Sequence, residues 1–174
     1  MPPRNGALKA REFLFLCEDQ ALPLVPSTLR PSGRSVMWTI LQLHYGDPKI
    51  HYELQPMPSR NQVELGLHFE ATIDRNDAWA SLIAHHAAPL QAELGSSWEL
   101  EIWTASWRRL HRVYHAEALT TTLAAEVAGD LARLISATAD IVRDGLAEAS
   151  LHAPATSQRA VSRPPAASLR TWRT

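Results

Sequence analysis

The chain of 174 residues is long enough for one domain of ordinary size and leaves little room for a second. Its net charge of −1 combines regions of opposite sign. Residues 37–149 carry eight Lys and Arg against fifteen Asp and Glu, a net charge of −7, whereas residues 150–174 contain four arginines and no acid. The acidic body makes nucleic acid an unlikely partner, because phosphates need clustered basic side chains. It favours a protein partner with basic side chains.

A single cysteine, Cys17, excludes an internal disulfide and a cysteine-rich zinc site, and is typical of a reducing compartment. No run approaches the roughly 18 apolar residues that suggest a membrane span, and the run FLFLC is shorter than a signal-peptide core. We therefore expect a cytoplasmic protein without a membrane segment. The Ala-, Leu- and Arg-rich composition suggests a bacterial protein.

A change in patterning near Met37 predicts where the folded domain begins. Residues 1–36 include three prolines within ALPLVPSTLRPSGRS, and we expect a partly disordered extension in which residues 9–19 could form a short helix or strand. Residues 37–149 show sustained periodicity and are expected to form a single domain. Residues 150–174 are rich in Pro, Ala and Arg, which predicts a disordered basic tail.

Alternating apolar and polar residues predict three antiparallel strands, within residues 37–46, 49–55 and 62–71. Turn residues separate them, GDP before the second strand and PMPSRN before the third, so a meander is expected.

The second half of the domain is expected to alternate helix and strand. A helix should begin near Asp74 and end at Gly95, with Pro89 kinking or dividing it. Two further strands are predicted within residues 97–115, followed by a long amphipathic helix capped near Thr120. The result is an α+β fold, an antiparallel sheet of about five strands with this C-terminal helix and a second helix packed on one face.

This order of elements, three strands, a helix, two strands and a helix, resembles that of the small dimeric secretion chaperones of bacteria. The resemblance lies in element order alone, and no motif in the sequence carries it. It implies an acidic dimer that binds segments of other proteins without catalysis.

The polar side chains of the three strands should share the sheet face opposite the helices, because side chains alternate along a strand. They are His44, His51, Glu53, Glu64, His68 and Glu70. His44, His51 and His68, or two of them with a carboxylate, would be a ligand set for zinc or another divalent ion. The alternative is a solvated sheet face, which also needs polar residues. The absence of closely spaced histidine pairs on these strands favours the solvated face.

Two tryptophans, Trp103 and Trp107, fall on the side of a strand that carries Glu99 and Glu101. Exposed aromatic residues among charges are typical of a protein interface, although the extension, the tail or a bend could cover them. The expected binding residues are Glu53, Glu70, Glu99, Glu101, Trp103 and Trp107. The basic tail with Trp172 has the charge to pack on the same acidic face, and the alternative, favoured by its composition, is a solvated and disordered tail.

Enzyme signatures are absent from the sequence: there is no phosphate-binding glycine loop, no Gly-x-Ser-x-Gly and no His-Glu-x-x-His. We therefore expect no catalytic residues and no cofactor. The predicted function is a non-enzymatic protein-binding domain, adaptor or chaperone-like, that forms a homodimer and uses the His/Glu/Trp face of its sheet. The alternative is a metal-dependent hydrolase with a His/Glu site on that face.

Overall fold

The computed structural model describes residues 6–151, which form a six-stranded antiparallel sheet and four α-helices. The strands are β1 (Gly33–Met37), β2 (Ile40–His44), β3 (Ile50–Met57), β4 (Gln62–Phe69), β5 (Glu99–Ile102) and β6 (Arg108–His115). The helices are α1 (Ala10–Ala21), α2 (Ile73–His85), α3 (Ala87–Leu94) and α4 (Thr121–Leu151). The strand order is β1-β2-β3-β4-β6-β5. The expected α+β class and long C-terminal helix are confirmed, with six strands where about five were expected.

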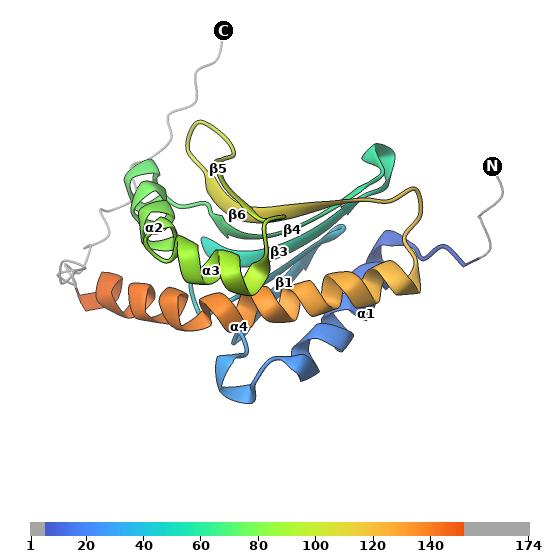
Figure 1. The fold of residues 1–174 in the computed structure, drawn as a ribbon, viewed down its shortest axis with the longest axis horizontal. Coiled ribbons are helices and arrows are strands. Elements are labelled where there is room, and N and C mark those ends of the chain that lie inside the picture. The colour runs from blue at the N-terminus through green and yellow to red at the C-terminus, as the bar shows by residue number, and fades with distance from the viewer. Residues whose placement is uncertain (1–5, 152–174) are drawn as a thin grey trace, which may run out of the picture.

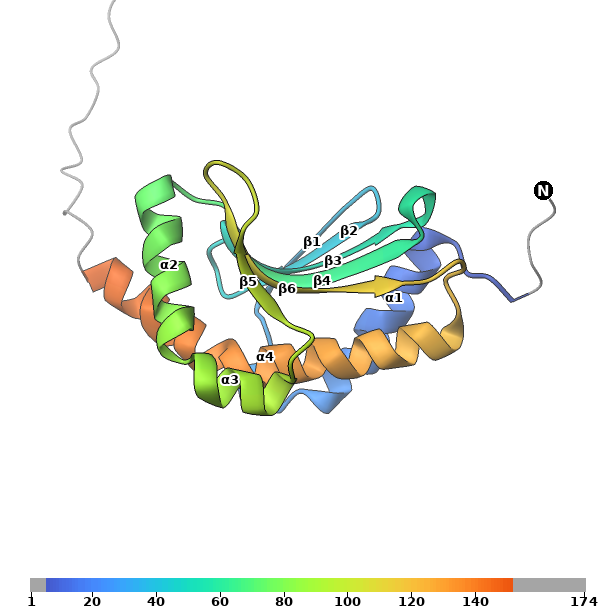
Figure 2. The ribbon, with the colours of Figure 1, turned by 45° about the horizontal axis from the view of Figure 1, so that its top comes forward.

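The helices cover one face of the sheet and leave the other open. Figures 1 and 2 show α1 and α4 along the lower face, with α2 and α3 beside α4. Apolar side chains of the strands, such as Leu41, Leu65 and Leu67, are buried against the helices together with Leu131 and Leu134 of α4. In Figure 2 the connection between β5 and β6 rises above the opposite face.

The fold begins well before Met37, which corrects the expected domain boundary. Phe13, Leu14 and Cys17 of α1 are fully buried in the core, and β1 pairs along its length with β2. The ion pair between Arg34 and Glu18, 2.6 Å long, joins β1 to α1. The apolar residues of α1 recur at helical spacing, so this short helix has a face to bury although the residues after it read as a linker.

Several expected boundaries agree with the structure. The helical region divides at His86 into α2 and α3, and Pro89 lies in the first turn of α3, where its missing N–H is not needed. Gly95, with φ of 88°, ends α3. The Thr120 hydroxyl accepts a hydrogen bond of 3.1 Å from the Leu123 N–H and caps α4.

Among residues 6–151, no helix combines the length and apolar character needed to cross a membrane. Of the predicted basic tail, residues 152–174, including Trp172, lie outside the described part of the chain.

Candidate functional site

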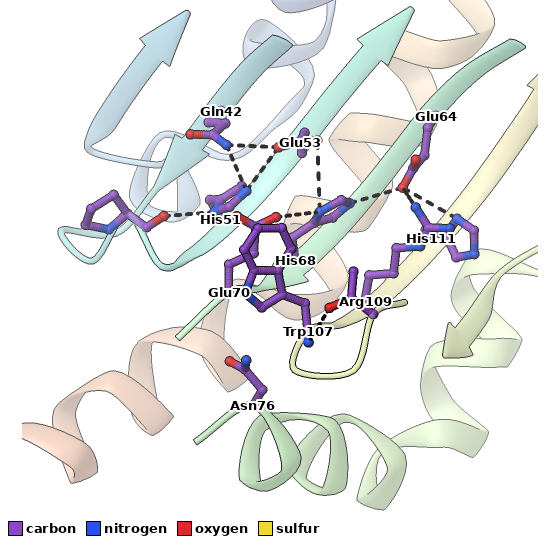
Figure 3. A network of polar contacts seen from close by, with 12 residues as sticks. Gln42, His51, Glu53, Glu64, His68, Glu70, Asn76, Trp107, Arg109 and His111 are labelled. Atoms are coloured by element: carbon purple, nitrogen blue, oxygen red, sulfur yellow. Dashed lines mark hydrogen bonds and ion pairs between the residues drawn. The ribbon is translucent and has the colours of Figure 1, made fainter. Parts of the chain in front are cut away.

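The register of the sheet gathers polar side chains in the middle of its open face. His51 of β3 is paired with His68 of β4, and Glu53 is paired with Gly66. Because Gly66 has no side chain, it leaves space between its neighbours: a Cβ there would lie 2.9 Å from the Cβ of His111. Side chains from β2, β3, β4 and β6 therefore meet in one cluster (Figure 3).

This cluster is buried, so the prediction that these residues lie on a solvated face is wrong for the central ones. His51 is 1% exposed, His68 0% and Glu53 5%. The connection between β5 and β6 contributes part of the cover: the Trp103 ring packs edge-on against the His68 ring, with centroids 5.0 Å apart. The ring centroid of Trp107 lies 5.5 Å from that of Trp103.

Hydrogen bonds fix this cover to the body of the domain. The buried Asn76 side chain of α2 donates to the carbonyl of Ser106 at 2.8 Å and accepts from the Ala71 N–H at 2.9 Å. Arg109 of β6 lies over the Trp103 ring, 4.7 Å from its centroid, and contacts Glu101. The two tryptophans are thus held over the cluster from both sides of the connection.

A chain of polar contacts runs across the cluster (Figure 3). The Gln42 amide donates to Glu53 at 2.9 Å and lies 3.1 Å from Nε2 of His51. His68 lies among three carboxylates, at 3.2 Å from Glu64, 3.5 Å from Glu70 and 4.0 Å from Glu53.

The charges of the cluster stabilise one another. Burial alone would lower the pKa of His68, but the carboxylates of Glu64 and Glu70 outweigh it and raise the pKa to about 9. Burial opposes ionisation of Glu53, yet its hydrogen bond with His51 and the charge of His68 bring its pKa below the ordinary value. Burial also opposes ionisation of Glu64, but its hydrogen bond with His68 and the charges of His68 and Arg109 bring its pKa below the ordinary value. At neutral pH Glu53 and Glu64 are therefore ionised beside a protonated His68.

The residues expected from the sequence separate into two groups. His51, Glu53, His68 and Glu70 lie together. His44 pairs with His51 in the sheet, but its ring lies against Gly33 of β1 and its Nδ1 accepts a hydrogen bond from the Gly46 N–H at 3.2 Å. Glu99, Glu101, Trp103 and Trp107 belong to β5 and its connection to β6. Gln42, Gly66, Arg109 and His111 were not expected in the site. Of these four residues, only Gln42 could have been expected from the sequence, because it alternates in phase with His44 and therefore faces the same side of the sheet.

The strand β5 forms a second notable feature, a free edge of the sheet. Its apolar residues are unusually open, with Leu100 38% and Ile102 70% exposed, and Trp107 beyond them is 36% exposed. Glu99 and Glu101 alternate with them and face His111 and Arg109 on the open face.

No protein-family model, curated protein or solved structure matches the chain.

Proposed function

We propose that this domain binds an extended segment of another protein along the free edge of β5, as a non-enzymatic binding or adaptor protein. The segment would place apolar side chains over Leu100 and Ile102 and basic side chains beside Glu99 and Glu101. The observation that carries the proposal is this edge strand, whose four residues alternate between acidic and exposed apolar side chains.

The backbone of β5 is available for pairing. Among residues 6–151 the strand pairs only with β6, with Leu100 opposite Leu110 and Ile102 opposite Arg108. The unpaired N–H and C=O groups of an edge strand are a template on which an extended segment can add a further strand. Such pairing supplies affinity through the main chain, and the pockets beside the edge supply specificity.

Two hollows lie beside β5 on the helix side and suit apolar side chains. One, of about 200 Å³, is lined by residues including Ile83, Leu94, Trp98 and Leu100. The other, of about 350 Å³, is lined by residues of α2 together with Leu100 and Ile102. Trp98 in the wall of the first hollow has an indole N–H that is buried without a hydrogen-bond partner among residues 6–151.

The carboxylates of β5 select the partner's charge. Two copies of β5 paired antiparallel, with matching faces, would set Glu99 and Glu101 against the same carboxylates, and like charges directly opposite are destabilising. A foreign strand with Lys or Arg at these positions avoids this repulsion. We keep the homodimer expected from the sequence as part of the proposal, with an interface on a surface other than the β5 edge. Sedimentation equilibrium at tens of micromolar protein tests whether the dimer forms.

The hydrolase alternative receives less support from the geometry. His51, His68 and Glu53 are almost fully buried, and catalytic metal sites keep an open position for water or substrate. A closed cluster does not offer that position.

The test measures binding of fluorescent peptides of about ten residues that alternate apolar residues with lysine. We expect Ile102→Lys to weaken binding at least about tenfold by charge repulsion and lost apolar contact. Leu24→Lys, at a residue 64% exposed away from the sheet, is the matched control and should bind normally. Peptides with aspartate in place of lysine should not bind. Binding that Ile102→Lys leaves unchanged, or no binding by any lysine peptide, would overturn the proposal.

A further inference from the structure

We propose that one divalent transition-metal ion, zinc or a chemically similar ion, binds between His51, Glu53, His68 and Glu70 in a closed structural site. One ligand atom from each of the four side chains lies within 4.8 Å of every other. Two imidazoles and two carboxylates are a ligand set for zinc, and imidazole also suits nickel and iron.

The spacing of these atoms is close to that of a four-coordinate ion. Nitrogen and oxygen ligands about 2.1 Å from a tetrahedral zinc ion are about 3.4 Å from one another. The distance from His51 Nε2 to Glu53 Oε2 is 3.2 Å, and from His68 Nδ1 to Glu70 Oε1 it is 3.5 Å. His68 Nδ1 and Glu53 Oε1 are 4.0 Å apart. The two contacts of Glu53 use different carboxylate oxygens, and the four ligand atoms lie within 4.8 Å of one another, so the side chains must move closer together to coordinate one ion.

Both histidines have the second hydrogen bond that orients metal ligands. Nδ1 of His51 is 2.8 Å from the carbonyl oxygen of Pro48, which can only accept, so Nδ1 carries the proton. The lone pair of a neutral His51 is then on Nε2, toward Glu53. Nε2 of His68 is 3.2 Å from Glu64, so Nδ1 of His68 is the atom left for the ion. A backbone carbonyl or a carboxylate behind the ring is the common outer contact of a ligating histidine.

The inner nitrogen of His68 is an independent indication. His68 is 0% exposed, and its Nδ1 has no hydrogen-bond partner among residues 6–151, although it faces the carboxylates of Glu53 and Glu70 at 4.0 and 3.5 Å. Buried polar atoms in native proteins are nearly always satisfied, so an exception calls for an explanation such as an ion.

The charge of the cluster points the same way. Within residues 6–151, neither Glu53 nor Glu70 is paired with a lysine or an arginine, whereas Glu64 is paired with Arg109. Glu53 is 5% exposed. Histidines are the ion-pair partners of Glu53 and Glu70 among these residues, and a divalent ion would place more positive charge beside both carboxylates.

A metal here would join β3 to β4 and stabilise the contact with Trp103, which packs on His68. The second candidate group, Glu99, Glu101 and His111, is more open, although Nδ1 of His111 is also buried without a hydrogen-bond partner among residues 6–151. Glu99 is exposed, and Glu101 is already bonded to Arg109.

The experiment is a calorimetric titration of chelator-treated, full-length protein with Zn²⁺, followed by Co²⁺ absorption spectroscopy. We expect one ion per chain. His68→Gln and Glu53→Gln should each weaken binding by more than about 100-fold, because they remove direct ligands and even outer-shell changes cost up to that factor. Glu70→Gln removes a ligand whose side chain is 17% exposed, so this variant tests the site even if the two buried variants misfold. His44→Gln is the control, and we expect it to bind one ion normally.

Three results would overturn the site. The first is no binding of Zn²⁺ or Co²⁺ at micromolar concentration. The second is unchanged affinity in folded His68→Gln, Glu53→Gln and Glu70→Gln proteins. The third is loss of binding in His111→Gln alone, which would assign the ion to the other group.

Discussion

Gly66 of β4 lies directly opposite His111 of β6, and the two backbones are so close that a Cβ on Gly66 would lie 2.9 Å from the Cβ of His111. The carbonyl oxygen of Leu110 would be 3.0 Å away. Neither atom is at the free end of a flexible side chain, so the strands would have to separate. We expect Gly66→Ala to lower the free energy of unfolding by about 1–3 kcal/mol, the usual range for overpacking.

Gly129 of α4 is the control for this substitution, because a Cβ there would meet nothing within 4 Å. Gly129→Ala should raise the free energy of unfolding by about 0.5–1 kcal/mol, since alanine is the better helix former. Urea unfolding of both variants gives the comparison. A stabilised Gly66→Ala protein would show that the cluster is less closely packed than the structure has it.

A second prediction concerns Asp130, the buried acid that links α4 to β6. Its carboxylate accepts a hydrogen bond of 2.6 Å from the Tyr114 hydroxyl and forms ion pairs with Arg112 and Arg133. We expect Asp130→Ala to lower the free energy of unfolding by about 3 kcal/mol, because breaking a buried pair leaves the partners unsatisfied.

The matched control is Asp140→Ala on the same helix. Asp140 is 78% exposed, and its contact with Arg143 is 4.0 Å long. Exposed pairs of this kind contribute little, so the change should stay within about 0.5 kcal/mol. Chemical denaturation measures both, and equal effects would contradict the role given to Asp130.

A third prediction tests whether α1 belongs to the core. Cys17 is fully buried, and burial raises the pKa of its thiol to about 12. Since the thiolate is the reactive form, Cys17 should not react with a thiol reagent at pH 8 until α1 detaches or the protein unfolds. The measurement is labelling by Ellman's reagent with and without denaturant. Labelling of the native protein at the rate of a free thiol would show that α1 is not docked.

The sequence was a good guide to strands and helices with clear periodicity. Alternation predicted that His51, Glu53 and His68 point to one face, and the structure brings them together. Pro89 and Gly95 marked the boundaries of α2 and α3 because both residues restrict the backbone locally.

The burial of that face was not predictable in the same way. It depends on Trp103 packing against His68, residues 35 positions apart in the sequence, and on the register that places His111 opposite Gly66. Both are tertiary relationships with no periodic signal. The role of α1 was missed for another reason, because Pro23, Pro26 and Pro31 make the region after it look like a linker.

The last prediction concerns Trp38, at the turn between β1 and β2. Met37 and Ile40 are paired, so Trp38 and Thr39 are the two central residues of a tight hairpin turn. Trp38 has φ of 54°, a left-handed conformation at the position where such turns prefer glycine. Its side chain is 87% exposed, so it has little packing to offset the strain.

We therefore expect Trp38→Gly to raise the free energy of unfolding by about 1 kcal/mol, the cost of the left-handed conformation for a residue with a Cβ. Thr39→Gly is the control: Thr39 does not have a positive φ, so glycine there should lower stability by about 0.5–1 kcal/mol. Thermal and urea unfolding of both variants decide the matter. A destabilised Trp38→Gly protein would contradict the assignment of strain to this position.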